Sequence, residues 1–237
     1  MQSAIKVRIY VHGATAPANK DKNSGQGGQN PTDGSPGLPG EPNHTPEPDT
    51  PIQTAHRFTD LDGYDWARDA IVDLAEQDII KGTGMNTFSP AANIKRADFT
   101  VLLVRALKLD SNSADNFDDV KASDYFANEL AIAKANGIVT GIGGNRFNPG
   151  GEITRQDMMV IAARALEKAG VKLEAATQED LELFKDASDI SDYAKDAVAI
   201  LTKNGIVKGV NGLINPSGKT TRAEVAVLIR RILDLLQ

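Results

Sequence analysis

Apolar and polar residues follow the same order three times along this chain. In each copy an aromatic and an acidic residue precede a stretch with helical apolar spacing, and a glycine turn, a proline and an arginine follow it. The copies begin at Phe58, Phe117 and Phe184. A repeat of this length is one supersecondary unit that buries its apolar face against its siblings, so three copies predict a single folded module.

The second copy shows which elements the pattern predicts. Ser123 precedes an apolar-periodic stretch, and we expect it to cap a helix from about Asp124 to Asn136. Thr154 and Asp157 have the spacing of a capping box, in which Asp157 reaches back to the start of a second helix. The expected fold is therefore all-α, with three tandem helix–loop–helix repeats.

The first copy departs from this pattern at two positions. Asp78 stands where the second copy has Gly137, a glycine expected to end its helix in the left-handed region, which Asp also tolerates. Lys95 replaces the capping threonine, yet Arg96 remains. An arginine that persists where the helix signal fades indicates a role besides folding.

The pattern and the composition together divide the chain into parts. We expect a remnant strand of an upstream domain, or a cloning scar, at residues 1–12. A Pro/Gly-rich, disordered linker should follow at 13–56, where eight of the eleven prolines lie. The folded parts are repeat 1 at 57–109, repeat 2 at 116–167, an inter-repeat segment at 168–183 and repeat 3 at 184–237.

The inter-repeat segment has one local signal of its own. Thr177 and Asp180 have capping spacing, so a short helix is expected to start at Thr177.

Composition excludes several chemistries from the repeats. The chain has no cysteine, and its histidines are His12, His44 and His56, so neither a Ser-His-Asp nor a His-ligated metal site can form there. Acidic residues outnumber basic ones by 32 to 26, which provides no basic surface for nucleic acid. We expect no catalytic residue, cofactor or metal. The carboxylates of 60–65 should form a turn, because they lack the register of a calcium loop.

These motifs resemble those of the S-layer homology (SLH) family. The resemblance rests on the Phe-x-Asp starts, the Gly-Ile-Val-x-Gly turns and the Ile-Thr-Arg-x-Asp box at 153–157, and it covers about three quarters of the chain. It implies a pseudo-threefold spindle with a central three-helix bundle. It also implies that grooves between repeats bind secondary cell-wall polysaccharide, commonly with a pyruvylated amino sugar, on Gram-positive peptidoglycan outside the cell.

The resemblance further implies which residues contact this ligand. The box arginine is the recurrent contact, while the turn glycines and an aromatic residue shape the groove. An aspartate is expected to orient each guanidinium. Carried over, the candidates are Arg96, Arg155, Arg222, Gly82, Gly141, Gly209, Trp66, Tyr125, Tyr193, Asp60, Asp119 and Asp186.

Physical chemistry supports these roles but leaves alternatives open. An arginine at the first position of a helix lies beside N–H groups that favour an anion, and its guanidinium can bind a carboxylate with two bonds. It could instead lock the repeat through an ion pair with Asp60, Asp119 or Asp186. The aromatic residues could stack on sugar, Trp66 most readily, or belong to the core. The glycines could serve backbone geometry alone.

Three functions remain open from sequence. The first is a wall-anchoring module that tethers an upstream domain. The second is the self-assembly part of a surface lattice. The third is a glycoside-processing enzyme using carboxylates such as Asp118 and Asp186, which we place last because capping aspartates are a poor match for a raised-pKa acid. We expect this chain alone to be a monomer without membrane insertion.

Overall fold

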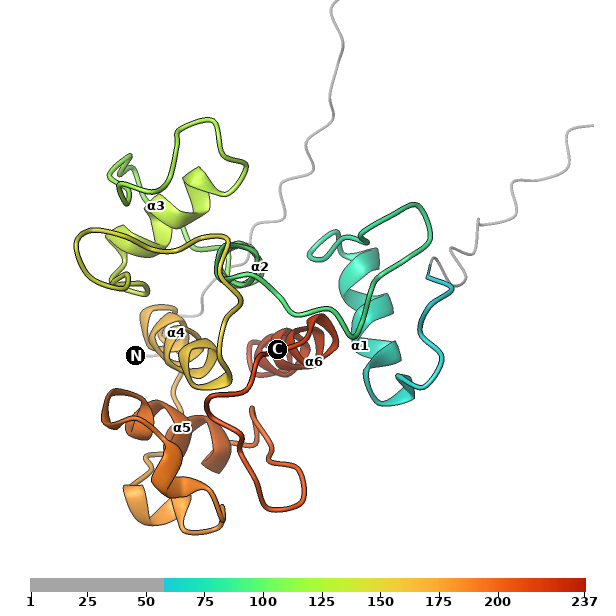
Figure 1. Cartoon of the computed structure of the whole chain (residues 1–237), viewed down its shortest axis with the longest axis vertical. Coiled ribbons are helices and arrows are strands. Elements are labelled where there is room, and N and C mark those ends of the chain that lie inside the picture. Colours follow the sequence, from blue (N-terminus) through green and yellow to red (C-terminus); the bar gives the residue numbers. More distant parts are fainter. Residues whose placement is uncertain (1–57) are drawn as a thin grey trace, which may run out of the picture. The chain divides into compact units, whose positions relative to one another are not determined.

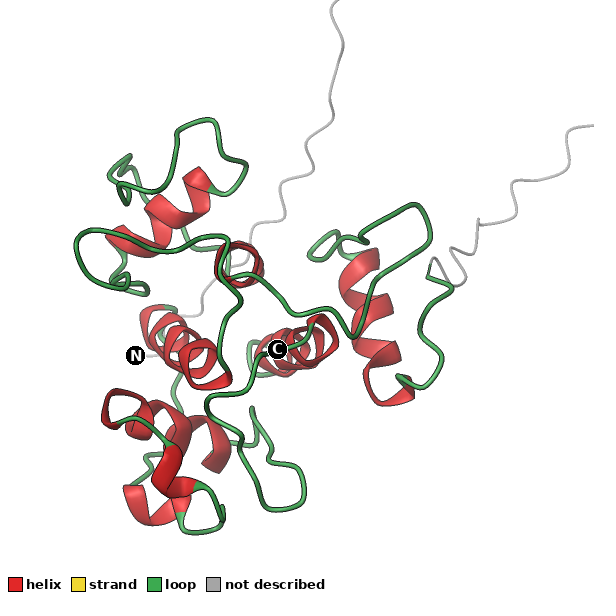
Figure 2. Cartoon of the chain, viewed as in Figure 1, coloured by secondary structure: helices red, strands yellow, loops and turns green. Residues whose placement is uncertain are grey.

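The computed structural model describes residues 58–237. The remnant strand expected at 1–12 and the linker expected at 13–56 lie outside the described residues. The described part has six α-helices and three short 3-10 helices joined by loops, and its β structure is limited to isolated bridges. Figure 2 accordingly shows helices and loops and no strand in this part. The all-α prediction is confirmed.

The helices alternate between the outside and the centre of the module. Their bounds are α1 Asp65–Glu76, α2 Arg96–Ala106, α3 Ala127–Ala135, α4 Arg155–Lys168, α5 Lys195–Lys203 and α6 Arg222–Asp234. The second helix of each repeat (α2, α4 and α6) runs close to the viewing direction at the centre of Figure 1, and the first helices (α1, α3 and α5) lie around them. The predicted central three-helix bundle is present.

The main helix pairs join different repeats. Helix α3 of repeat 2 packs on α2 of repeat 1, α5 of repeat 3 packs on α4 of repeat 2, and α1 of repeat 1 packs on α6 of repeat 3 (Figure 1). Each lobe therefore combines the outer helix of one repeat with the central helix of another. The sequence repeat is not the packing unit.

A closed ring of backbone hydrogen bonds joins the three repeats just before the central helices. The N–H of Ile94 donates to Thr220 (2.9 Å), that of Thr220 to Ile153 (3.2 Å), and that of Ile153 back to Ile94 (3.2 Å). All three side chains are buried. Each bond links a different pair of repeats, so the ring fixes the pseudo-threefold arrangement.

Of the predictions made for helix ends, one is wrong and one is confirmed. The expected Ser123 cap is wrong, because α3 begins only at Ala127, and Asp124 instead accepts a bond from the N–H of Lys121 (2.8 Å) in the preceding turn. The left-handed conformation of Asp78 is confirmed, with φ 55° against 71° at Gly137.

The capping boxes also differ. Thr154 caps α4 as expected, but the predicted return contact from Asp157 is absent, because that carboxylate accepts hydrogen bonds from Arg96 and Tyr193 instead. The corresponding pair in repeat 3, Thr221 and Glu224, forms both bonds.

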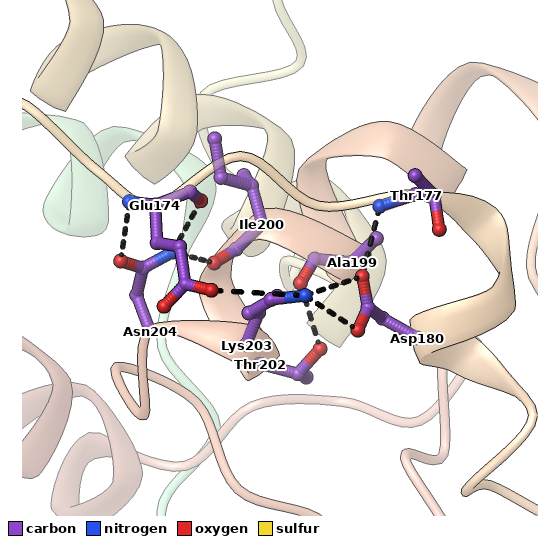
Figure 3. A network of polar contacts seen from close by, with 8 residues as sticks. All are labelled: Glu174, Thr177, Asp180, Ala199, Ile200, Thr202, Lys203 and Asn204. Carbon is purple, nitrogen blue, oxygen red and sulfur yellow. Dashed lines mark hydrogen bonds and ion pairs between the residues drawn. The ribbon is translucent and has the colours of Figure 1, made fainter.

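The inter-repeat segment docks on α5 through polar contacts, which Figure 3 shows. The expected short helix is present as the 3-10 helix η1, Gln178–Leu181, and the backbone of Thr177 donates to Asp180. Lys203 of α5 bonds to Asp180 (3.0 Å), and Asn204 both accepts from and donates to the backbone of Glu174. The remaining short helices, η2 (Ala187–Asp189) and η3 (Asp192–Ala194), lead into α5.

Candidate functional site

The three candidate arginines join the repeats in a cycle. Each guanidinium donates from Nε to a loop carbonyl of another repeat: Arg96 to Phe147 (3.1 Å), Arg155 to Ile214 (2.8 Å) and Arg222 to Phe88 (2.8 Å). Their backbone N–H groups also donate to loop carbonyls, of Gly151, Gly218 and Ala92 in turn. These N–H groups are therefore paired within the protein and are not free to bind an anion.

Two of the arginines are paired with a carboxylate of the next central helix. Arg96 lies 3.0 Å from Asp157, and Arg155 lies 2.6 Å from Glu224. Both arginine side chains are largely buried. For Arg96 and Arg155 the alternative of an ion pair with Asp60, Asp119 or Asp186 is wrong, because their partners are Asp157 and Glu224, which the sequence predicted as capping residues.

The three aspartates of the Phe-x-Asp motifs have another structural role. Each carboxylate accepts hydrogen bonds from two successive backbone N–H groups of its own loop: Asp60 from Phe88 and Ser89, Asp119 from Phe147 and Asn148, and Asp186 from Ile214 and Asn215. They shape the loop whose carbonyl receives the arginine, so they position the guanidinium only through the backbone.

These hydrogen bonds lower the pKa of two of the carboxyl groups, those of Asp60 and Asp119. Burial acts to raise the pKa of Asp60, but the N–H donors of Phe88 and Ser89 outweigh it and hold the pKa below its ordinary value. The pKa of Asp119 is lowered against the same effect of burial, by the N–H groups of Phe147 and Asn148.

The turn glycines lie where the loop crosses an aromatic ring. A Cβ atom on Gly82, Gly141 or Gly209 would lie 2.4–2.8 Å from a loop carbonyl oxygen and 2.6–2.9 Å from the ring of Phe58, Phe117 or Phe184. Among the three, only Gly141 has a positive φ, of 78°. Close packing of the loop therefore requires glycine at all three positions, and left-handed backbone geometry requires it at one.

The three aromatic candidates are exposed, so the alternative that they belong to the core is wrong. Trp66, Tyr125 and Tyr193 are 57%, 67% and 58% exposed. The Tyr125 hydroxyl donates to Asp98, and the Tyr193 hydroxyl donates to Asp157 at 2.7 Å. Partial burial and these carboxylate partners raise the pKa of each tyrosine to about 12. Both phenols therefore stay protonated as donors at neutral pH.

Each aromatic residue is grouped with an arginine and a carboxylate from the other two repeats, through a shared groove at Trp66 and through the carboxylate at Tyr125 and Tyr193. Repeat 1 contributes Trp66, repeat 2 Arg155 and repeat 3 Glu224 to the first constellation. The pseudo-equivalent sets are Tyr125, Arg222 and Asp98, and Tyr193, Arg96 and Asp157. The candidate residues thus come together, but across repeats.

The Trp66 constellation lines an open groove of about 620 Å³, hereafter the Trp66 groove. Four cationic side chains and one carboxylate line it: Arg155, Lys208, Lys219, Arg231 and Glu224. Gly209 and Tyr64 also line it. The motifs of the sequence did not predict Lys208, Lys219 or Arg231 as lining residues. An alignment of the repeats could have indicated the two lysines, because repeat 2 has the uncharged Thr140 and the acidic Glu152 at the positions of Lys208 and Lys219.

Charge separates the Trp66 groove from two other hollows of similar size. A hollow of about 750 Å³ between α4 and α5 has two basic residues, Arg164 and Lys172, and two acidic ones, Glu167 and Asp196. A third, of about 610 Å³ between α1 and α6, is lined by three arginines and three aspartates. Of these three hollows, the Trp66 groove alone has a cationic excess suited to an anion.

The comparison with known families agrees with the threefold pattern. The model of the S-layer homology domain matches residues 57–100, 116–159 and 183–226. The chain belongs to the SLH family. The three matches cover the three repeats, and each extends from the Phe-x-Asp start into the central helix.

Curated relatives share this SLH region. Over 173 residues the chain is 37% identical to an amylopullulanase of Thermoanaerobacterium thermosulfurigenes, and this match covers 71% of this chain and 9% of the amylopullulanase. It is 31% identical over 191 residues to a surface-layer 125 kDa protein of Lysinibacillus sphaericus, a match that covers 78% of this chain and 16% of that protein. It is 30% identical over 161 residues to a cellulosome-anchoring protein of Acetivibrio thermocellus, a match that covers 65% of this chain and 35% of that protein.

The chain therefore spans only a small part of these relatives, and the shared part is the SLH region, a non-catalytic anchoring module of cell-surface proteins. Within residues 58–237, every helix is too short or too polar to cross a membrane.

Proposed function

We propose that this SLH module anchors a larger surface protein by binding an acidic cell-wall polysaccharide in the Trp66 groove. The observation that carries the proposal is the groove's lining of four cationic side chains and one carboxylate in a chain with a net charge of −6. A local cationic excess on an acidic protein favours an anionic ligand.

The remaining lining suits a sugar that bears a carboxylate. The exposed indole of Trp66 offers an apolar face for a pyranose ring. Lys208 and Lys219 are exposed and can bind a carboxylate as point charges. A pyruvylated amino sugar carries both features, so it is the ligand that we propose for this groove.

Sedimentation with purified Gram-positive wall sacculi tests the proposal, before and after acid removal of the secondary polymer. We expect binding that disappears with the polymer. The double variant Lys208→Glu/Lys219→Glu and the variant Trp66→Ala should each lose most of it. The matched control is Lys121→Glu/Lys168→Glu, which makes the same charge change at exposed positions outside the groove.

Two outcomes would contradict this function. Binding that survives removal of the polymer would point to another wall component. An equal loss in the groove variant and in the matched control would show that net charge, rather than the groove, controls retention.

A role as the self-assembly part of a surface lattice is the second candidate, favoured by the similarity to a surface-layer protein. Sedimentation equilibrium of this chain separates the two functions. Concentration-dependent growth into large particles would support assembly by the module itself, whereas a monomer that binds sacculi supports anchoring alone.

A further inference from the structure

Asparagine is followed directly by glycine at three places in the chain, at residues 136–137, 204–205 and 211–212. Such a pair is prone to deamidation, because glycine has no Cβ to hinder its backbone nitrogen from attacking the asparagine side chain. The reaction requires that this nitrogen and the side-chain carbonyl carbon can approach each other. The contacts around each pair therefore decide which of the three reacts in the folded chain.

The first pair lies at the end of α3 and is held on both sides of the bond that would form. The amide of Asn136 donates to the carbonyls of Asp110 (3.1 Å) and Ile132 (2.9 Å). The N–H of Gly137 donates to the carbonyl of Lys134 (3.0 Å). Attack would require all of these bonds to break, so the fold protects this pair.

The second pair lies at the end of α5 and is held in the same way. The amide of Asn204 donates to the carbonyls of Glu174 (2.9 Å) and Ile200 (2.8 Å), as Figure 3 shows. Its oxygen accepts from the backbone of Glu174 (2.8 Å), and the N–H of Gly205 donates to Thr202 (3.0 Å). This pair is protected as well.

The third pair forms an exposed turn of two residues. Asn211 and Gly212 have φ values of 54° and 74°, the left-handed geometry for which Asn-Gly is favoured in tight hairpin turns. Val210 and Leu213 exchange two backbone bonds (2.9 Å each), and the Gly212 carbonyl accepts from Lys185 (2.8 Å). Within residues 58–237 the Gly212 N–H donates to no acceptor, and the Asn211 side chain is exposed and forms no hydrogen bond.

We propose that Asn211 is a site of spontaneous deamidation, which places a carboxylate beside the Trp66 groove. The nitrogen of Gly212 loses its proton to solvent and bonds to the side-chain carbonyl carbon of Asn211. The bond from that carbon to the amide nitrogen breaks, and ammonia leaves with the proton. Water then opens the cyclic imide to aspartate or isoaspartate, so the net reaction consumes water and releases ammonia.

The position of this site connects the modification with binding. Gly209 and Val210, which directly precede Asn211, line the Trp66 groove. Either product adds a negative charge there, and isoaspartate also adds a main-chain carbon to the turn. A unit charge about 10 Å from an anion weakens its binding by about twofold in water at low salt. This effect on binding rests on the proposed function, whereas the modification itself does not.

Peptide mapping by mass spectrometry tests the site without a ligand. One sample of the chain is incubated folded in mildly alkaline buffer, and a parallel sample is incubated in urea. The peptide with Asn211 should gain the mass of an amide-to-acid change in both, whereas those with Asn136 and Asn204 should change only in urea. An Asn211 that reacts only in urea would overturn the proposal. So would folded-state conversion of Asn136 or Asn204 as fast as that of Asn211.

Sedimentation with purified wall sacculi at low salt tests the effect on binding. After the incubation the unchanged chain should bind about twofold more weakly or worse. Asn211→Gln should keep its affinity, because its longer side chain would have to close a larger ring. Asn211→Asp should reproduce the loss without incubation. The matched control is Asn112→Asp, the same charge change at an exposed position outside the groove.

The outcomes separate the modification from the proposed function. Equal binding by Asn211→Asp and the fresh unchanged chain, or an equal loss in Asn112→Asp, would overturn the link to the Trp66 groove. No binding by the fresh chain, with Asn211 converted during the incubation, would refute the proposed function and leave the modification standing.

Discussion

Arg155 of the second repeat donates to Glu224 of the third repeat at 2.6 Å, and both side chains line the Trp66 groove. Glu224 also completes the cap of α6, because it accepts from the backbone of Thr221. A single ion pair therefore joins two repeats, completes a helix start and lines the candidate binding site. Stability and binding depend on the same contact.

Arg155→Ala should for this reason lower the free energy of unfolding as well as binding. The change removes the bond to Ile214 and leaves Glu224 without its partner. Because Glu224 keeps some contact with solvent, we expect a loss of about 2 kcal/mol, below the range for a fully buried pair. Urea denaturation measures it. The control is Arg146→Ala, at an exposed arginine, where the substitution should lower the free energy of unfolding by less than about 0.5 kcal/mol. Equal losses in the two variants would contradict the role of the Arg155 contacts.

Thr220→Val should stabilise the module. Thr220 is fully buried in the ring of backbone bonds, where its counterparts are Ile94 and Ile153, and its hydroxyl has no partner among the described residues. Replacing a buried unsatisfied hydroxyl by a methyl group of the same shape should add about 1 kcal/mol to the free energy of unfolding.

Thr100→Val is the matched control for this substitution, measured by the same thermal or urea unfolding. Thr100 is equally buried, but its hydroxyl donates to the backbone carbonyl of Arg96 (2.9 Å), so the variant should be no more stable than the unchanged chain. A loss of stability in Thr220→Val would show that a partner, such as a buried water, satisfies this hydroxyl.

Gly82→Ala should destabilise repeat 1 through crowding alone. The added Cβ would lie 2.5 Å from the carbonyl oxygen of Thr87 and 2.7 Å from the ring of Phe58, while φ at this glycine is unremarkable. Overpacking of this kind costs about 1–3 kcal/mol. Gly150→Ala is the control, since its Cβ would meet nothing within 4 Å. Thermal unfolding of both variants checks the prediction, and an unchanged midpoint in Gly82→Ala would refute it.

The free energy of unfolding should fall in acid because of Asp60 and Asp119. Their pKa values in the folded protein are lowered, against about 3.9 for an unfolded aspartate, so the unfolded state binds protons first. The stabilisation is complete above the unfolded pKa and is lost as the pH falls through the folded pKa. Urea unfolding at several pH values from about 6 to 2 measures this slope.

Asp119→Asn should reduce that slope, because the amide does not titrate in this range. The variant should also be less stable at neutral pH, since one amide oxygen replaces two carboxylate oxygens as acceptor for Phe147 and Asn148. The control is Asp62→Asn, the same change at a fully exposed side chain, and a loss of slope as large as that in Asp119→Asn would contradict the prediction. An unchanged slope in Asp119→Asn would exclude this carboxyl as a source of the acid sensitivity.

Local patterns in the chain were sufficient for much of the fold. The helix periodicity, the cap at Thr154 and the left-handed Asp78 depend on residues within a few positions of each other, so they could be predicted. The start of α3 could not, because the turn around Asp124 competes with the capping signal of Ser123. The spacing of Asp157 likewise predicted a capping box, but Arg96 and Tyr193 of other repeats take that carboxylate.

The sequence by itself determined that there are three copies, that they are helical, and that each supplies one arginine, one aromatic residue and one acidic helix start. Only the tertiary structure decided which copies meet. Because each outer helix packs on the central helix of another repeat, Trp66, Arg155 and Glu224 converge from three different copies. The order and hand of this ring are properties of packing in three dimensions, and a linear pattern of equivalent repeats contains no information about them.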